Sequence, residues 1–152
     1  MKALLDSSTL IAAMLPDHVH HGPAHAWLAQ AKTGALEFVV SGHSVAEVYS
    51  VLTRLPRTPR IRPEEAWQLL QDNVTSCANL VTLTARDYAA LVEELSQRGI
   101  IGGAVYDAVI AKAAELAQVE RLVTLNEAHF QHVWPAGADR IVSPLSVAPP
   151  SA

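Results

Sequence analysis

Residues 2–8 read KALLDSS, a short apolar run that ends at Asp6 and leads into two hydroxyl residues. A run of this kind is typical of a buried strand. A carboxylate directly after such a strand indicates the carboxyl edge of a parallel sheet, where open α/β folds place their binding sites. Asp6 is therefore the first candidate site residue, and a site there requires further polar groups from other parts of the chain.

Similar apolar runs recur along the chain and alternate with segments of helical character. Strands are expected at residues 2–5, 36–40, 80–83, 122–125 and 140–142. Helices are expected at about residues 8–14, 23–31, 44–55, 64–73, 85–98 and 104–118. Short strands separated by helices predict an α/β fold, a three-layer α/β/α sandwich around a mostly parallel sheet of four to five strands. We expect one domain over residues 1–147 and a flexible tail over residues 148–152.

Residues that favour helix N-termini precede or open most of the expected helices. They are Ser7 or Ser8, Pro23, Ser44, and Thr84 together with Asp87. The last two form a candidate capping box, in which each residue satisfies a backbone N–H of the other. Gly102 and Gly103 are expected to allow a tight entry into the helix at residues 104–118.

Composition limits the class of protein. The chain has 152 residues, enough for one well-formed core, and half of them are hydrophobic, which argues against disorder. The net charge of −4 argues against a nucleic-acid coat protein, but not against an enzyme that meets nucleic acid through a metal ion. Cys77 is the only cysteine, which excludes an intramolecular disulfide. No apolar stretch suits a membrane helix or a signal peptide, so we expect a cytoplasmic protein.

Three acidic residues lie among apolar neighbours, where a charged group is costly unless it is paired or bound to a cation. Asp6 ends the first strand, Glu47 lies within residues 45–49 (VAEVY), and Asp107 lies within residues 104–110 (AVYDAVI). Glu47 and Asp107 are expected in the first turns of their helices, so all three side chains can face one crevice. Hard oxygen ligands of this kind suit Mg²⁺ or Mn²⁺ rather than zinc.

Each of these acids also has a purely structural interpretation. Asp6 can cap the first helix, because acidic residues favour helix N-termini. Glu47 completes a capping box with Ser44. Asp107 can complement the dipole of its helix. For each residue taken alone, the structural interpretation is a real alternative to a role in a shared site. It explains less well why all three acids have the same apolar surroundings.

Four segments together resemble, in order and spacing, the acidic motifs of PIN domains. They are residues 4–8 (LLDSS), 45–49 (VAEVY), 105–108 (VYDA) and 122–130 (LVTLNEAHF). The resemblance covers essentially the whole chain and is closest to the VapC-type toxins of bacterial toxin–antitoxin pairs. It implies a Mg²⁺- or Mn²⁺-dependent endoribonuclease that acts on RNA, is held inactive by a partner antitoxin, and forms a homodimer.

Residue by residue, the resemblance assigns Asp6, Glu47 and Asp107 as the metal-binding carboxylates. Ser8 and Thr124 match hydroxyl groups near the site. These assignments are carried over from the family motifs and do not follow from spacing alone.

The fourth motif departs from the fully acidic pattern of the family. Many members carry Asp where this chain has Asn126, or three residues later where it has His129. Asn126, a candidate catalytic residue, offers a carbonyl oxygen but no charge. His129 is expected to line the site without binding metal. Because fewer anionic ligands hold two divalent ions less tightly, we expect one protein-held ion and a second ion only when RNA phosphate recruits it.

A dense basic cluster follows the Glu47 helix and suggests RNA phosphate binding, with a solvated loop as the alternative. The cluster consists of Arg54, Arg57, Arg60 and Arg62. Paired histidines elsewhere, at residues 21 and 25 and at residues 129 and 132, have no obvious third ligand in sequence and therefore favour surface or packing roles over zinc.

The implied reaction is hydrolysis of RNA by metal-activated water, with Asp6 and Asp107 holding the ion and Glu47 binding it or orienting the water. Two alternatives differ in class. A phosphatase that uses Asp6 as a nucleophile would normally carry a second Asp where this chain has Ser8. A non-catalytic binding module on the same fold is the other, and Asn126 and His129 make it plausible.

Overall fold

A central parallel sheet organises the computed structural model, which describes residues 1–151. The five strands are β1 (Lys2–Leu5), β2 (Glu37–Ser41), β3 (Asn79–Val81), β4 (Arg121–Val123) and β5 (Ile141–Val142). Their order in the sheet is β3-β2-β1-β4-β5, and each neighbouring pair is parallel. The expected mostly parallel sheet is thus confirmed, with β1 at its centre.

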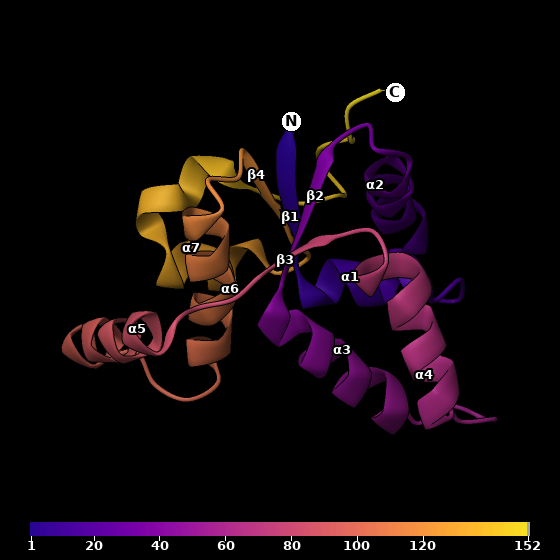
Figure 1. Cartoon of the computed structure of the whole chain (residues 1–152), viewed down its shortest axis with the longest axis horizontal. Coiled ribbons are helices and arrows are strands. Elements are labelled where there is room, and N and C mark those ends of the chain that lie inside the picture. The colour runs from indigo at the N-terminus through magenta and orange to yellow at the C-terminus, as the bar shows by residue number, and fades with distance from the viewer. Residues whose placement is uncertain (152) are drawn as a thin grey trace.

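Helices cover both faces of this sheet (Figure 1). One layer holds α1 (Ser7–Met14), α2 (His21–Thr33), α3 (Gly42–Arg54) and α4 (Pro63–Leu70), which continues as the π-helix η1 (Gln71–Thr75). The other holds α5 (Ala85–Gln97), α6 (Ala104–Leu116), α7 (Glu127–Val133) and the 3-10 helix η2 (Pro135–Arg140). The predicted three-layer α/β/α fold is therefore confirmed. No helix within residues 1–151 has the length and apolar character needed to cross a membrane.

Alternation along the strands divides the core into two clusters. Leu5 and Val40 belong to the cluster under α1, α2, α3 and α4, whereas Leu4, Val39 and Leu122 belong to the cluster under α5, α6 and α7. Successive strand residues point to opposite faces, so a sheet buried on both sides needs apolar residues at every position. This requirement explains the uninterrupted apolar runs in the sequence.

The strand register brings distant polar residues together at the carboxyl edge of the sheet. Leu5 of β1 is paired with Val123 of β4, and the Asp6 N–H donates to the Val123 carbonyl at 3.1 Å. The next residue of each strand is therefore Asp6 in one case and Thr124 in the other. In Figure 1, β1 and β2 descend to this edge, where α1 and α3 begin.

Two of the expected helix starts are wrong. Asp6 itself is the N-cap of α1, because its carboxylate accepts a hydrogen bond from the Thr9 N–H, so neither Ser7 nor Ser8 caps this helix. The second helix begins at His21, before Pro23. A proline is tolerated there because the first turn of a helix needs no internal N–H donors.

The expected cap at Ser44 is also wrong, and with it the capping box with Glu47. The helix α3 follows β2 directly and begins at Gly42, so Ser44 lies inside it and Glu47 lies in the second turn. Ser44 is fully buried and hydrogen-bonded to Ser7, with their hydroxyl oxygens 2.9 Å apart. A tertiary contact between α1 and α3 therefore takes the hydroxyl that the local pattern would assign to a cap.

Other local expectations are confirmed. Thr84 and Asp87 form the expected capping box at the start of α5. Gly102 has a φ of +66°, a left-handed conformation that favours glycine, in the turn that leads into α6. The segment after β4 was expected only to end a strand, but Asn126 is instead the N-cap of the additional helix α7.

The C-terminal segment is attached to α2. Trp27 is buried in this helix, and its indole N–H donates to the Val147 carbonyl at 2.9 Å. Residues 144–149 together with Pro23 and Ala26 line a shallow cavity. The domain boundary at residue 147 and the flexible tail over residues 148–152 stay predictions, and residue 152 lies outside the described residues.

Candidate active site

Asp6 is the most buried acidic group at the carboxyl edge of the sheet, with 3% of its surface exposed. Its Oδ1 accepts the Thr9 N–H at 2.9 Å, and its Oδ2 accepts the Thr124 hydroxyl at 2.6 Å. The Ser8 hydroxyl lies 2.8 and 2.9 Å from the two oxygens. Of the residues predicted to surround Asp6, Ser8 and Thr124 are therefore in direct contact with it.

Both hydroxyl groups are oriented by the backbone of the fourth motif. Thr124 Oγ1 accepts the Asn126 N–H at 2.9 Å, and Ser8 Oγ accepts the Leu125 N–H at 3.1 Å. Each hydroxyl thus receives a hydrogen from the backbone and directs its own hydrogen toward Asp6. Such donors favour the ionised form of the carboxyl group.

The balance of these effects decides how Asp6 can ionise. Burial raises the pKa of Asp6, and the hydrogen bonds from Thr124, Thr9 and Ser8 oppose that increase without cancelling it. Within residues 1–151, no basic side chain forms an ion pair with this carboxylate. A buried carboxylate without a cationic neighbour gains most from a bound cation.

The hydrogen-bond count around Asp6 leaves room for such a ligand. A carboxylate has about four acceptor positions, and the three hydrogens of Ser8, Thr9 and Thr124 occupy three of them. One lone pair therefore remains for a cation, and oxygen donors of this type fit Mg²⁺ or Mn²⁺.

The other two candidate carboxylates lie on the helices beside this edge, and both are half-buried. Glu47 projects from α3 and Asp107 from the first turn of α6. Burial and the nearby charge of Glu47 raise the pKa of Asp107, whereas His129 and His43 act in the opposite direction. Glu47 and Asp107 are therefore close enough to interact electrostatically.

A hydroxyl contact connects α3 to the start of α1, beside Asp6. Ser7, next to Asp6, is hydrogen-bonded to Ser44, which lies three residues before Glu47 on α3. As the side chains stand, however, no three His, Cys, Asp or Glu residues within 1–151 are grouped so as to hold a metal ion. Convergence of Asp6, Glu47 and Asp107 on one ion therefore stays a prediction.

His43 and Tyr106, which had no role predicted from the sequence, form a contact between α3 and α6. His43 Nε2 is 3.1 Å from Glu47 Oε2, and the His43 ring stacks on the Tyr106 ring with centroids 5.1 Å apart and planes 4° apart. Their positions in the sequence could have identified them as site residues. His43 lies one helical turn before Glu47, and Tyr106 directly precedes Asp107.

The fourth motif borders the site from α7. The Asn126 side chain is exposed, and His129 Nδ1 lies 3.9 Å from Asp107 Oδ2, a long contact. A pocket of about 330 Å³ lies against these groups and is lined by Gly103, Ala104, Asp107, Ala128, His129 and His132. His129 thus lies beside the site, as expected, and the role of Asn126 stays a prediction.

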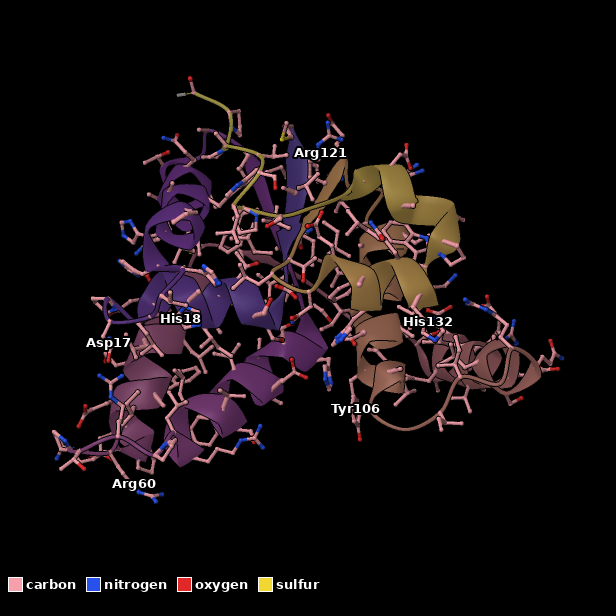
Figure 2. All side chains as sticks on the ribbon, turned by 180° about the vertical axis from the view of Figure 1, so that it is seen from behind. Asp17, His18, Arg60, Tyr106, Arg121 and His132 are labelled. Atoms are coloured by element: carbon pink, nitrogen blue, oxygen red, sulfur yellow. The ribbon has the colours of Figure 1, made fainter. Side chains whose placement is uncertain are left out.

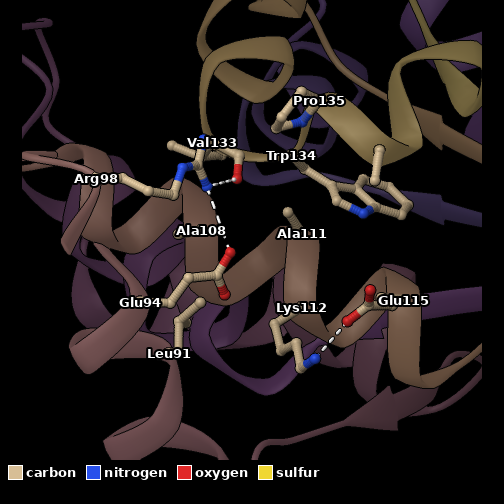
Figure 3. Close-up of a pocket in the computed structure, with 11 residues that line it drawn as sticks. Leu91, Glu94, Arg98, Ala108, Ala111, Lys112, Glu115, Val133, Trp134 and Pro135 are labelled. Atoms are coloured by element: carbon tan, nitrogen blue, oxygen red, sulfur yellow. Dashed lines mark hydrogen bonds and ion pairs between the residues drawn. The ribbon is translucent and has the colours of Figure 1, made fainter. Parts of the chain in front are cut away.

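Arg98, which sequence analysis left without a role, holds α7 in place. Its guanidinium donates to the carbonyls of His132 and Val133 at 2.8 and 3.0 Å. Figure 3 shows its contacts with Val133 and with Glu94 of α5. These carbonyls belong to the last turn of α7, where a helix has no internal donors for them. The adjoining cavity of about 240 Å³ also contains the Lys112–Glu115 ion pair.

The arginine cluster lies away from the carboxylates, at the other end of α3, and Figure 2 shows Arg60 far from Tyr106. Two of its members have acidic partners: Arg57 pairs with Asp17, and Arg62 pairs with two neighbouring glutamates. Arg54, at the end of α3, is exposed. RNA binding by this cluster stays a prediction.

Comparisons with known proteins agree with this architecture. The profile of the PIN domain family matches residues 3–133. Ribonuclease VapC27 of Mycobacterium tuberculosis is 40% identical over 110 residues, which make up 72% of this chain and 74% of that protein. Ribonuclease VapC40 of the same species is 33% identical over 117 residues, 77% of this chain and 81% of that protein.

Likeness in fold extends further than likeness in sequence. The crystal structure of VapBC2 from Rickettsia felis, bound to a DNA fragment from its promoter, contains a chain with a TM-score of 0.63 and 21% identity. The match covers 94% of this chain and 98% of that one. This chain therefore belongs to the PIN domain family, and its relatives place it among the VapC-type members.

Proposed function

We propose that this protein is a Mg²⁺- or Mn²⁺-dependent endoribonuclease, the toxin of a toxin–antitoxin pair, that hydrolyses RNA phosphodiester bonds. The observation that carries the proposal is the state of Asp6. This carboxylate is buried, accepts three oriented hydrogen bonds and has no basic partner among the described residues. A bound cation would add to the stabilisation that these hydrogen bonds give its charge, and Glu47 and Asp107 lie on the adjoining helices.

The side chains of the site have different proposed roles. Asp6 and Asp107 hold the ion, directly or through water, and Glu47 binds it or orients the attacking water. Ser8 and Thr124 favour the ionised form of Asp6 and fix its orientation. When bound, the divalent ion activates water and stabilises the charge that develops on the phosphate.

Relatives support the nuclease and partner assignments. VapC27 and VapC40 are named ribonucleases, and the Rickettsia felis complex is named as a VapBC pair on DNA. By extension, we propose that this protein cleaves RNA and binds a cognate antitoxin. We also propose that it forms a homodimer and is located in the cytoplasm. Light scattering of the purified protein, alone and with the product of a neighbouring small reading frame, tests both assemblies.

The central test is an RNA cleavage assay. Purified protein is incubated with labelled single-stranded and structured RNA in Mg²⁺, in Mn²⁺ or in EDTA. We expect internal cleavage only with a divalent ion, and a loss of at least about 100-fold in the Asp6→Asn variant, because that change removes the buried charge that binds the cation.

Two controls make the assay decisive. Asp139→Asn alters an exposed carboxylate outside the site and is expected to cleave normally. Cleavage that persists in EDTA or in Asp6→Asn would contradict a metal nuclease. Phosphate release from a small ester without RNA cleavage would support the phosphatase alternative, and binding without turnover would support a non-catalytic module.

A further inference from the structure

The stacked pair of His43 and Tyr106 is an exposed aromatic surface that bridges two helices of the site. Tyr106 is 53% exposed although its ring is large and mostly apolar. One face of the ring meets His43 in a parallel stack, and Figure 2 shows Tyr106 projecting outward beside α3. More than half of Tyr106 is therefore accessible, which leaves room for contact with a further planar group.

The orientation of this surface is fixed before any ligand arrives. His43 Nε2 lies 3.1 Å from Glu47 Oε2, one helical turn away, and this contact restrains the imidazole. The imidazole in turn faces Tyr106 with planes only 4° apart. A preorganised ring loses little conformational entropy when a ligand stacks on it.

Position connects the stack to the carboxylates. Tyr106 directly precedes Asp107 in the first turn of α6, so both side chains project from the same end of that helix. His43 contacts Glu47 itself. A nucleotide whose phosphate lies near Asp107 and Glu47 therefore has a flat aromatic surface within reach of its base.

The chemistry of the surroundings favours a base over a phosphate as the group that meets this surface. Tyr106 stacks on His43 rather than on an arginine or a lysine, and the arginine cluster begins at the far end of α3. Base stacking on a tyrosine needs no charge and uses only the faces of the two rings.

We propose that Tyr106, backed by His43, is the platform on which an unpaired RNA base next to the cleaved phosphate stacks. The inference rests on the proposed ribonuclease function and assigns part of its substrate recognition. If the stack only joins α3 to α6, the effect of a Tyr106 substitution on kcat/KM should not depend on whether the RNA base is present. The experiment below distinguishes this structural role from base stacking.

The experiment combines a ring deletion with a base deletion. After the cleavage site is mapped with the wild-type protein, RNAs with one abasic nucleotide on either side of that site are compared by kcat/KM. We expect one of the two base deletions to reduce wild-type kcat/KM by roughly tenfold, a typical value for the loss of one stacked base. Tyr106→Ala should show a similar reduction on intact RNA and no further loss on the same abasic RNA.

Matched variants identify the contribution of the ring. Tyr106→Phe retains the ring and is expected to behave like the wild type, whereas Tyr106→Leu retains bulk without aromaticity and is expected to match Tyr106→Ala. Tyr88→Ala removes an exposed tyrosine of α5 and should have no effect. Additive losses from Tyr106→Ala and the abasic nucleotide, or normal activity of Tyr106→Ala, would overturn the inference.

Binding separates this inference from the proposed function. A single-stranded RNA that carries 2-aminopurine is titrated with wild-type protein and with Tyr106→Ala. If RNA is not cleaved but the fluorescence is quenched only when Tyr106 is present, the nuclease proposal fails, whereas stacking of an RNA base on Tyr106 is retained. If RNA is cleaved and quenching does not depend on Tyr106, the nuclease proposal stands and the platform is refuted.

Discussion

Thr124 donates its hydroxyl hydrogen to Asp6 Oδ2 at 2.6 Å, across 118 residues of sequence. The same hydroxyl oxygen accepts the Asn126 N–H, so the hydroxyl hydrogen of Thr124 is directed toward Asp6. Thr124 is fully buried, and water cannot replace either interaction. One side chain therefore links the first motif of the chain to the fourth.

Replacing Thr124 with valine should affect both stability and activity. The change removes a hydrogen bond that lowers the pKa of Asp6 and leaves a backbone N–H without its acceptor. We expect a loss of about 1–3 kcal/mol in the free energy of unfolding, and a shift of the acidic limb of kcat/KM to higher pH. Thr124→Ser keeps the hydroxyl and should restore both. An unchanged acidic limb in Thr124→Val would show that this hydrogen bond does not control Asp6.

Asp6 should also impose a pH dependence on stability in the absence of metal. Burial raises the folded-state pKa of this carboxyl above its ordinary value of 3.8, so the folded protein binds the extra proton more tightly than the unfolded chain. The stabilisation is complete below 3.8 and is lost as pH rises through the folded-state pKa, at about 1.4 kcal/mol per pH unit within that window.

The Asp6→Asn variant should lack this component. Urea unfolding in EDTA across pH 4 to about 8 measures it, and the stability of the variant relative to the wild type should increase with pH and then level off. Asp139→Asn should keep the wild-type slope, because this exposed carboxylate lies outside the site. A wild-type slope in Asp6→Asn would indicate that another group is responsible.

Local sequence signals predicted elements better than they predicted contacts. The strands were recognisable because a sheet covered on both faces needs apolar residues at consecutive positions, and the Thr84–Asp87 capping box formed because its partners are three residues apart. Asp6 could be identified for the same reason, as a carboxylate that directly follows the central strand.

Signals failed where a tertiary contact decided the outcome. Ser44 appeared to be a helix cap, but β2 passes directly into α3 and the hydroxyl of Ser44 meets Ser7 instead. The stack of His43 on Tyr106 joins two helices, and no local pattern specifies how these helices approach. The candidate site depends on sheet order and helix packing, which the motifs alone do not encode.

Gly137 should tolerate no side chain. A Cβ atom at this position would lie 2.2 to 2.4 Å from the buried ring of Trp134. We expect Gly137→Ala to reduce the free energy of unfolding by roughly 1–3 kcal/mol or more, because the ring must shift within a packed core. Gly22→Ala in α2 meets no atom within 4 Å and should instead be neutral or stabilise by up to about 1 kcal/mol. Urea unfolding compares the two, and equal effects would contradict the packing argument.

Arg54 should contribute more to RNA binding than the rest of the arginine cluster. It follows Glu47 by seven residues on α3, which places both on one helix face about 10 Å apart. Arg54→Ala should weaken binding similarly for all RNA sequences and reduce the slope of log affinity against log salt by about 1. Arg60→Ala, in the loop beyond α3, is the matched control and should change little. The reverse order of effects would place the RNA across the loop rather than along α3.

Asn126 is the position at which a single added charge should change metal binding. It is exposed at the N-cap of α7, and its backbone N–H already helps to orient Thr124 toward Asp6. Asn126→Asp adds a carboxylate without lengthening the side chain and should increase Mn²⁺ affinity by roughly tenfold, because divalent affinity rises with ligand charge.

Calorimetric titration of the RNA-free protein gives the number of ions as well as the affinity. We expect one tight ion in the wild type and a second measurable ion only in Asn126→Asp. Asn126→Ala removes the carbonyl oxygen without adding charge, and it should leave the first ion bound because that ion depends on the buried Asp6 carboxylate. Two tight ions in the wild type would refute the single-ion expectation, and an unchanged titration in Asn126→Asp would place the fourth motif outside the coordination sphere.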